Sequence, residues 1–323
     1  MTTTAPTATA IAPTTRHQIQ KSGEDRYETL LEKFTENQDV RPSSQALYKR
    51  TLKHFFKWVK KTGRSLDRLT RVDILAYKES LTEDNLSELT QRSYIVVVRR
   101  FYEWAEGECL YPNIARGVKQ VPKHGKEKYK KLHLTEDQSA ALLSFFKHEN
   151  ARDFAMVNLM LRTGLRTIEV VNAKIGDITF RGQKRVLEVR GKARRDAADF
   201  VILTDKALEP LQDYLATRKG AKAGDPLFVS TSNNNAGKAL STRTISGICK
   251  RGLQAIGLDG KEYTAHSLRH TTATTLLKHG ASLFDCQLVM RHSSPSTTEI
   301  YLESILEEQR LRQAPERLLD SAF

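Results

Sequence analysis

The stretch TAHSLRHTTATTLLKHG, residues 264–280, has the pattern of a helix that packs on a core, but it opens with polar side chains that a core does not require. Thr264 is a suitable N-cap. His266 and Arg269 are three residues apart, so a helix brings them to one face. A lone histidine here would usually be a satisfied structural residue; a histidine beside an arginine favours a binding role. The core-facing positions are Leu268, Ala273, Leu276 and Leu277.

A second polar stretch, TGLRTIEV, occupies residues 163–170. Gly164 can end one helix, and Arg166 opens the next beside free backbone N–H groups, which suits an anionic ligand. The alternative is an ion pair between Arg166 and Glu169, three residues further on, and both can hold together.

A third stretch, RHSSPSTTEIYLES, covers residues 291–304 and places His292 nine residues before Tyr301. The small residues between them, with Pro295, indicate a turn and a helix start that presents the tyrosine hydroxyl. A tyrosine this close to the chain end is otherwise a docked or surface ring. In a fourth stretch, Lys192 stands in the turn GKARRDAA between two predicted strands. The competing cations there are Lys184, Arg194 and Arg195.

Together these side chains suit metal-free attack on a phosphodiester. Two arginines can hold the nonbridging oxygens of the phosphate. A tyrosine hydroxyl, with a pKa of about 10, needs nearby positive charge or a base to become a nucleophile. A lysine can protonate the departing 5′ oxygen. No carboxylate cluster suited to divalent metal ions accompanies them, so we expect no metal and no cofactor.

Composition agrees with a nucleic-acid partner. The 323 residues carry 52 Lys and Arg against 38 Asp and Glu, a net charge of +14, which indicates a polyanionic partner. A ribosome-associated or membrane-surface protein would share that charge. No apolar run approaches the roughly twenty residues that span a bilayer. Three widely spaced cysteines, Cys109, Cys249 and Cys286, show neither a disulfide nor a metal-site pattern and favour a reducing cytoplasm.

The chain reads as two mainly α-helical domains. Residues 1–23 form a flexible tail, 24–111 a helical domain, 112–132 a basic linker, 133–310 a second domain and 311–323 a C-terminal tail. The first domain has helical patterns at 24–37, 44–63, 70–81 and 90–107. The second has strands at 177–180, 185–190 and 199–203 among helices at 134–149, 153–164, 205–218, 241–256, 264–279 and 282–291.

Basic residues gather on two helices of the first domain and in the linker. Any single one of them is most simply a solvated surface residue, but the concentration favours contact with phosphates. The candidates are Lys49, Arg50, Lys53, Lys57, Arg99, Arg100, Lys126, Lys128 and Lys130.

The stretches TGLRTIEV, HSLRHTTATTLLKHG and MRHSSPSTTEIY resemble the conserved boxes of the tyrosine recombinases, the phage-integrase and Xer-like family. The resemblance covers about residues 24–310. It implies a helical SAM-like core-binding domain and an α-rich catalytic domain with a small three-stranded antiparallel sheet. The implied activity is site-specific recombination through a 3′-phosphotyrosyl intermediate, without metal or ATP.

Residue roles follow from the same resemblance. Arg166 and Arg269 would clamp the scissile phosphate, and Glu169 would support them. His266 would assist proton transfer or phosphate binding, and His292 would hydrogen-bond the phosphate. Lys192 would be the general acid and Tyr301 the nucleophile. Two departures stand out: Arg291 replaces the usual glycine before the second histidine, and the turn around Lys192 lacks the usual glycine- and lysine-rich form.

The resemblance also implies partners: double-stranded DNA with inverted-repeat core sites, a homotetramer on that DNA and a possible partner recombinase. We expect a cytoplasmic, nucleoid-associated protein with no membrane partner. Type IB-like topoisomerase activity and a non-catalytic DNA-binding protein on the same fold are the alternatives. Apolar residues for docking the tail, on its own domain or on a neighbour, are Leu302, Ile305, Leu306, Leu318, Leu319 and Phe323.

Overall fold

The computed structural model describes residues 23–120, 132–190, 199–314 and 320, and the chain divides into two compact units, residues 1–127 and 128–323. Each unit has its own hydrophobic core. The division falls inside the stretch that the sequence predicts as a linker. Within the described ranges, no helix is long and apolar enough to cross a membrane.

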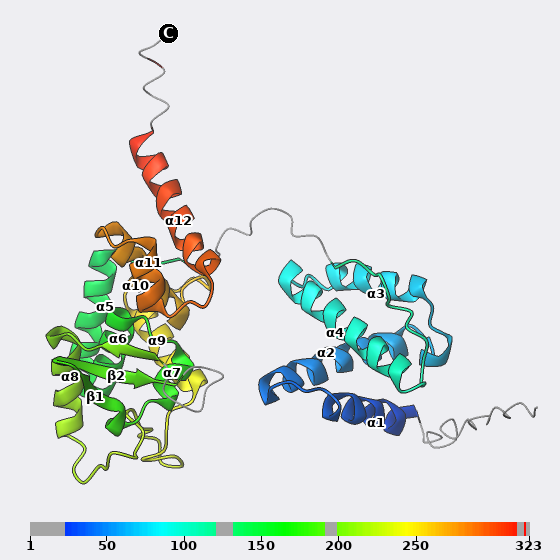
Figure 1. Cartoon of the computed structure of the whole chain (residues 1–323), viewed down its shortest axis with the longest axis horizontal. Coiled ribbons are helices and arrows are strands. Elements are labelled where there is room, and N and C mark those ends of the chain that lie inside the picture. The colour runs from blue at the N-terminus through cyan, green and yellow to red at the C-terminus, as the bar shows by residue number, and fades with distance from the viewer. Residues whose placement is uncertain (1–22, 121–131, 191–198, 315–319, 321–323) are drawn as a thin grey trace, which may run out of the picture. The chain divides into compact units, whose positions relative to one another are not determined.

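Unit 1 consists of helices whose apolar faces meet in one core (Figure 1). Leu52, Phe55 and Phe101 are fully buried there. Thr70 and Asp73 form a capping box at the start of α3. The elements are α1 (Gly23–Glu36), α2 (Pro42–Lys61), η1 (Leu66–Arg68), α3 (Arg71–Glu83) and α4 (Glu88–Gly107). All four predicted helices of this unit are confirmed.

The chain after α4 departs from the expected extended linker. Ala115 and Val118 are buried in the core of unit 1. Arg71 donates hydrogen bonds to the backbone carbonyls of Arg116 and Gly117. Residues 112–118 therefore pack on unit 1. Burial of the Ala115 and Val118 side chains removes apolar surface from water, which an extended segment would leave exposed. Lys126, Lys128 and Lys130 lie outside the described residues.

Unit 2 is a layer of helices around a second core. Thr135 and Gln138 form a capping box at the start of α5, and Thr264, the expected N-cap, forms one with Ser267 at the start of α10. The helices are α5 (Glu136–Glu149), α6 (Ala151–Thr163), α7 (Thr167–Asn172), η2 (Ile175–Asp177), α8 (Asp205–Ala216), α9 (Thr242–Ala255), α10 (Ala265–Lys278), α11 (Leu283–Met290) and α12 (Pro295–Gln313).

The strands of unit 2 form the predicted small antiparallel sheet (Figure 1). Among the described residues, the strand order is β1 (Ile178–Arg181), β2 (Lys184–Val189) and β3 (Asp199–Ile202). Leu187 pairs with Ile178 on one side and Val201 on the other, and Leu187 and Val189 are buried against the helices. The turn that carries Lys192 lies outside the described residues.

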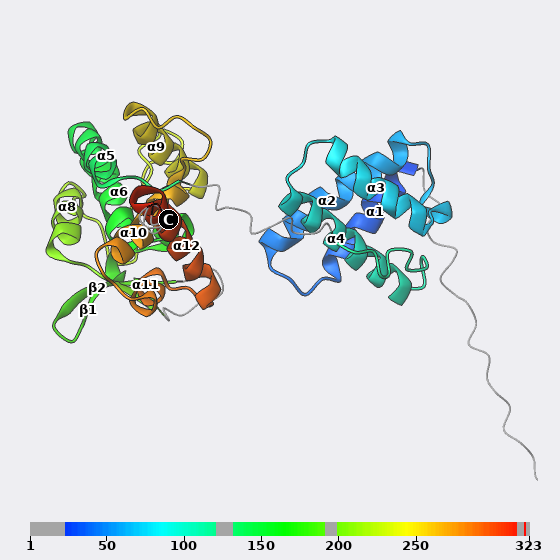
Figure 2. The ribbon, with the colours of Figure 1, turned by 90° about the horizontal axis from the view of Figure 1, so that it is seen from above.

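Helix α12 places Tyr301 in its second turn, beside α10 and α11 (Figures 1 and 2). Ile305 is buried and Leu306 is 53% exposed, so only Ile305 of this pair packs on its own unit, and docking of Leu306 on a neighbour stays a prediction. The reason is that consecutive residues lie about 100° apart around a helix, and a narrow contact buries only one of them. Leu318, Leu319 and Phe323 lie outside the described residues.

Candidate active site

A pocket of about 510 Å³ in unit 2 gathers three of the predicted residues. Arg166 reaches it from the connection between α6 and α7, and His266 and Arg269 reach it from the first turns of α10. Thr242 and Ser246 of α9 also line it. The one-face spacing of His266 and Arg269 therefore does what the sequence predicts: it directs both toward a common cavity.

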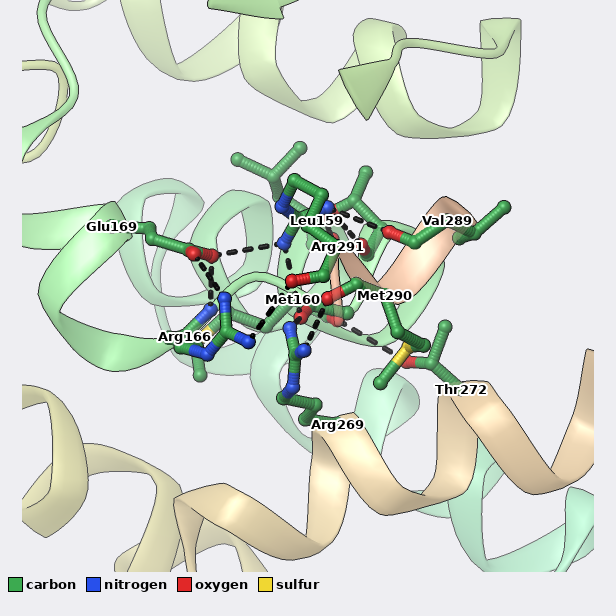
Figure 3. A network of polar contacts seen from close by, with 11 residues as sticks. Leu159, Met160, Arg166, Glu169, Arg269, Thr272, Val289, Met290 and Arg291 are labelled. Atoms are coloured by element: carbon green, nitrogen blue, oxygen red, sulfur yellow. Dashed lines mark hydrogen bonds and ion pairs between the residues drawn. The ribbon is translucent and has the colours of Figure 1, made fainter. Parts of the chain in front are cut away.

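Arg269 lies at the bottom of this arrangement, with only 2% of its surface exposed. Its Nη1 donates to the Gly164 carbonyl and its Nη2 to the Met290 carbonyl (Figure 3). Burial lowers the pKa of Arg269 to about 10, and the positive charges of Arg166 and Arg291 act in the same direction. The guanidinium is still cationic at neutral pH, and two backbone carbonyls fix its orientation.

Glu169 is the acidic centre of the site. It accepts from Arg166 Nη1 at 2.7 Å through one carboxylate oxygen and from Arg291 Nη2 at 2.9 Å through the other (Figure 3). The Arg166 backbone N–H also donates to it at 2.7 Å. Burial would raise the Glu169 pKa, but the charge of Arg291 and the bonds and charge of Arg166 hold that pKa below its usual range. The carboxylate is thus ionised although buried.

Arg291 occupies a backbone position that favours glycine. It is the C-cap of α11 with φ 54° and ψ 48°, in the left-handed region. A side chain in that conformation costs about 1 kcal/mol, which accounts physically for the glycine that the resemblance led us to expect. The Arg291 side chain instead forms an ion pair with Glu169, in which the two side chains are 3% and 2% exposed.

Tyr301 is packed between two histidines. Its ring stacks on His292 with 5.8 Å between centroids and 9° between planes, and meets His270 edge-on at 4.7 Å. His292 Nδ1 is 2.9 Å from the Thr298 hydroxyl, one turn before Tyr301 on α12. The tyrosine is 3% exposed and packs with Ala273, Cys286 and Met290. Its ring is therefore held in place by unit 2 itself.

The histidine pair is kept neutral at physiological pH. Burial lowers the pKa of His292 to about 4, with further lowering from the charges of Arg269, Arg166, Arg291 and His266. Burial likewise lowers the pKa of His270 to about 4. Tyr301 packs with Met290, whose backbone carbonyl accepts a hydrogen bond from Arg269. The six predicted catalytic and supporting residues that the structure describes thus belong to one neighbourhood.

The site differs from the sequence-based expectation in three places. Tyr301 is not among the residues that line the pocket. His270 supports the Tyr301 ring, a role that the sequence reasoning missed although His270 directly follows Arg269. The hypothesis of an Arg166–Glu169 ion pair is confirmed, but sequence reasoning gave Arg291 no part in it.

The predicted DNA contacts of unit 1 are exposed, as their proposed role requires. Lys53 pairs with Glu28 at 2.9 Å, and Arg100 lies over the Tyr48 ring at 5.7 Å. The exposed residues are Lys49, Arg50, Lys53, Lys57, Arg99 and Arg100.

Comparisons with known proteins agree with this geometry. The phage integrase family model matches residues 133–308, and the model of the phage integrase N-terminal SAM-like domain matches residues 28–108. Tyrosine recombinase XerC of Leptospira interrogans is 32% identical over 263 residues, 79% of this chain and 81% of the relative. Tyrosine recombinase XerD of Xanthomonas axonopodis is 31% identical over 290 residues, 85% of this chain and 91% of the relative.

Among solved structures, the XerH site-specific recombinase bound to a palindromic difH substrate superposes with a TM-score of 0.70. The match covers 89% of this chain and 83% of XerH at 21% identity, a level that speaks for the fold.

Proposed function

Because the chain belongs to the phage integrase family and is a tyrosine recombinase, an enzyme of site-specific DNA recombination, we propose that Tyr301 is its nucleophile. One observation carries the proposal: Arg166, His266 and Arg269 line a single pocket, and Tyr301 is stacked on His292 and packs with Met290, whose carbonyl binds Arg269. The recombinase relatives do not favour the topoisomerase and non-catalytic alternatives.

In the proposed reaction, the Tyr301 hydroxyl oxygen attacks the scissile phosphorus and its proton leaves toward His266 or water. Arg166 and Arg269 stabilise the charge that develops on the nonbridging oxygens, and His292 hydrogen-bonds one of them. The bond from phosphorus to the 5′ oxygen breaks, and Lys192 protonates that oxygen. A 5′-hydroxyl of another strand then reverses the step. The phosphotyrosyl bond keeps the energy of the phosphodiester, so no ATP is consumed.

The burial of Tyr301 adds a requirement to this mechanism. The ring is 3% exposed and does not line the pocket, so DNA binding has to bring its hydroxyl to the phosphate. Helix α12 carries that displacement in our proposal, because Tyr301 belongs to its second turn.

Double-stranded DNA is the partner. We assign to this chain an inverted-repeat core site, because XerH was solved on a palindromic substrate. A homotetramer on that DNA would bring together the four strands that are exchanged. In a heteromeric form of the same assembly, a second recombinase would replace two of the subunits. Such an enzyme works in the cytoplasm, at the nucleoid.

The test is covalent trapping on a nicked duplex. A pool of nicked duplexes with inverted-repeat arms is incubated with the full chain, and the duplex that forms an SDS-resistant adduct is selected. Wild type forms that adduct and Tyr301→Phe does not, while the variant keeps its affinity for the duplex. An adduct of equal yield with Tyr301→Phe would remove Tyr301 from the nucleophile role.

A further inference from the structure

We propose that Arg291 is a positioning residue for both phosphate-binding arginines: its side chain joins the end of α6 to the end of α11 and holds Glu169 against Arg166. The inference rests on the proposed function, because it gives Arg291 a task toward Arg166 and Arg269. It also makes a separate claim about the Glu169 carboxylate that can be tested without DNA.

The first support is the set of backbone carbonyls that Arg291 contacts. Its Nη1 donates to Val289 at 2.7 Å and to Thr163 at 3.4 Å, and its Nη2 donates to Gly164 at 3.4 Å. Thr163 and Gly164 end α6, and Val289 lies in the last turn of α11. One guanidinium thus joins two segments that are far apart in the sequence (Figure 3).

The same two segments hold Arg269. Its two terminal nitrogens donate to the Gly164 carbonyl, which Arg291 also contacts, and to the Met290 carbonyl, next to that of Val289. A shift of either segment would therefore move the carbonyls that orient Arg269. Arg291 acts on Arg269 through these carbonyls and not by touching the substrate, since its side chain is 3% exposed.

The second support is the division of Glu169 between two arginines. Arg291 takes one carboxylate oxygen and Arg166 the other, and Arg166 Nη2 also donates to the Arg291 carbonyl at 3.3 Å. The Arg166 side chain remains 39% exposed, so it still faces the pocket while its other edge is fixed. Arg291 Nε is buried and has no hydrogen-bond partner in the described part of the chain, so its terminal nitrogens set its position.

The charges around Glu169 predict a pH effect that separates this role from simple packing. The groups that act on it are Arg166 and Arg291; Arg269 is coupled to Glu169, and Asp199 of β3 to Arg291. Without the Arg291 charge, burial raises the Glu169 pKa. Glu169 then takes up a proton at higher pH and releases Arg166, so cleavage is lost at higher pH than in wild type.

Two substitutions test the inference on the selected nicked duplex. Arg291→Gly suits the left-handed backbone and removes the side chain, and Arg291→Lys keeps the charge but loses the planar fork. We expect Arg291→Gly to cleave roughly 10- to 100-fold more slowly at neutral pH with unchanged DNA affinity. The acid limb of its pH–rate profile, where cleavage is lost as the pH falls, should move to higher pH. Arg291→Lys is slower too but keeps the wild-type acid limb. Arg162→Ala, an exposed arginine of α6, is the matched control and cleaves as wild type does.

Carboxyl carbon NMR of Glu169 in the DNA-free full chain gives the independent readout. The Glu169 pKa rises in Arg291→Gly and stays near the wild-type value in Arg291→Lys. Wild-type cleavage and an unmoved acid limb in Arg291→Gly overturn the inference. If that variant does not fold, a folded Arg291→Lys with wild-type cleavage overturns it instead. If wild type forms no adduct on any duplex, the proposed function fails, and the NMR titration still decides whether Arg291 controls Glu169.

Discussion

Arg166 and Arg291 bind the two oxygens of one buried carboxylate, that of Glu169, although the two arginines are 125 positions apart. The first approaches at 2.7 Å and the second at 2.9 Å. Because Glu169 and Arg291 are almost fully buried, the ion pairs are shielded from water and salt. This cluster of Arg166, Glu169 and Arg291 supports the phosphate-binding side of the site, which consists of the exposed edge of Arg166 and of Arg269.

Glu169→Gln tests whether the ion pairs of Glu169 stabilise unit 2. It leaves Arg291 buried without an anion, and breaking a buried pair in this way costs about 3–5 kcal/mol of unfolding free energy. Both tryptophans, Trp58 and Trp104, belong to unit 1, so their fluorescence does not report on unit 2. Hydrogen exchange of peptides from α6 and α10 measures the loss. The control is Glu136→Gln, which removes an exposed pair with His279 and changes exchange little. Equal protection in both variants would contradict the assignment.

Arg166→Lys and Arg269→Lys should separate chemistry from stability. Both lose the planar fork that binds phosphate, and we expect each to lower the cleavage rate by about 100-fold or more. Only Arg269→Lys should also weaken hydrogen-exchange protection of α10 strongly, because Arg269 is 2% exposed and holds two carbonyls. Single-turnover cleavage and exchange on the same samples check this. An Arg269→Lys protein as stable as Arg166→Lys would speak against the carbonyl contacts.

The stability of unit 2 should fall in mild acid. The unfolded chain protonates histidine near pH 6.5, whereas burial lowers the pKa of His270 and of His292 to about 4. The unfolded state therefore binds more protons in this window, and stability is present above about pH 6.5 and lost as the pH falls toward 4. His270→Gln should reduce the slope of unfolding free energy against pH by the contribution of about one proton, or about 1.4 kcal/mol per pH unit. Hydrogen exchange from pH 7 to 5 measures it, and exposed His148→Gln should keep the wild-type slope.

The basic face of unit 1 makes a prediction about salt. Replacing Lys49, Arg50, Lys53 and Lys57 together with alanine should reduce the slope of log affinity against log salt by about 3 to 4, because each phosphate contact contributes about 0.9. The matched control removes four exposed lysines of unit 2: Lys147, Lys206, Lys219 and Lys222. Titrations of the selected duplex at several salt concentrations compare the two. Equal slopes would show that α2 does not bind the backbone.

Much of this architecture could be predicted from local sequence signals. The capping box of Thr135 and Gln138, the stop at Gly164 and the spacing of His266 and Arg269 are each set within a few residues, and the structure has all three. The small sheet followed from short β-branched runs between turn residues.

Contacts between distant segments escaped sequence reasoning. The bond from Arg291 to Glu169 and the contact of His270 with Tyr301 depend on how helices pack, and neither leaves a periodic signal. Ala115 and Val118 lie in a stretch whose composition indicates an extended linker, yet unit 1 had apolar surface left for them to cover. The exposed Leu306 shows the same limit: the apolar spacing in α12 indicates a packing face but not how far the contact of that face with unit 2 extends.

The most direct measurement is the site of covalent attachment. The adduct on the selected nicked duplex is digested with nuclease and trypsin, and the nucleotide-bearing peptide is sequenced by mass spectrometry. Trypsin releases residues 292–310, in which Tyr301 is the single tyrosine. The account predicts a nucleotide joined through its 3′ phosphate to Tyr301. A nucleotide on any other residue, or joined through its 5′ phosphate, would contradict it.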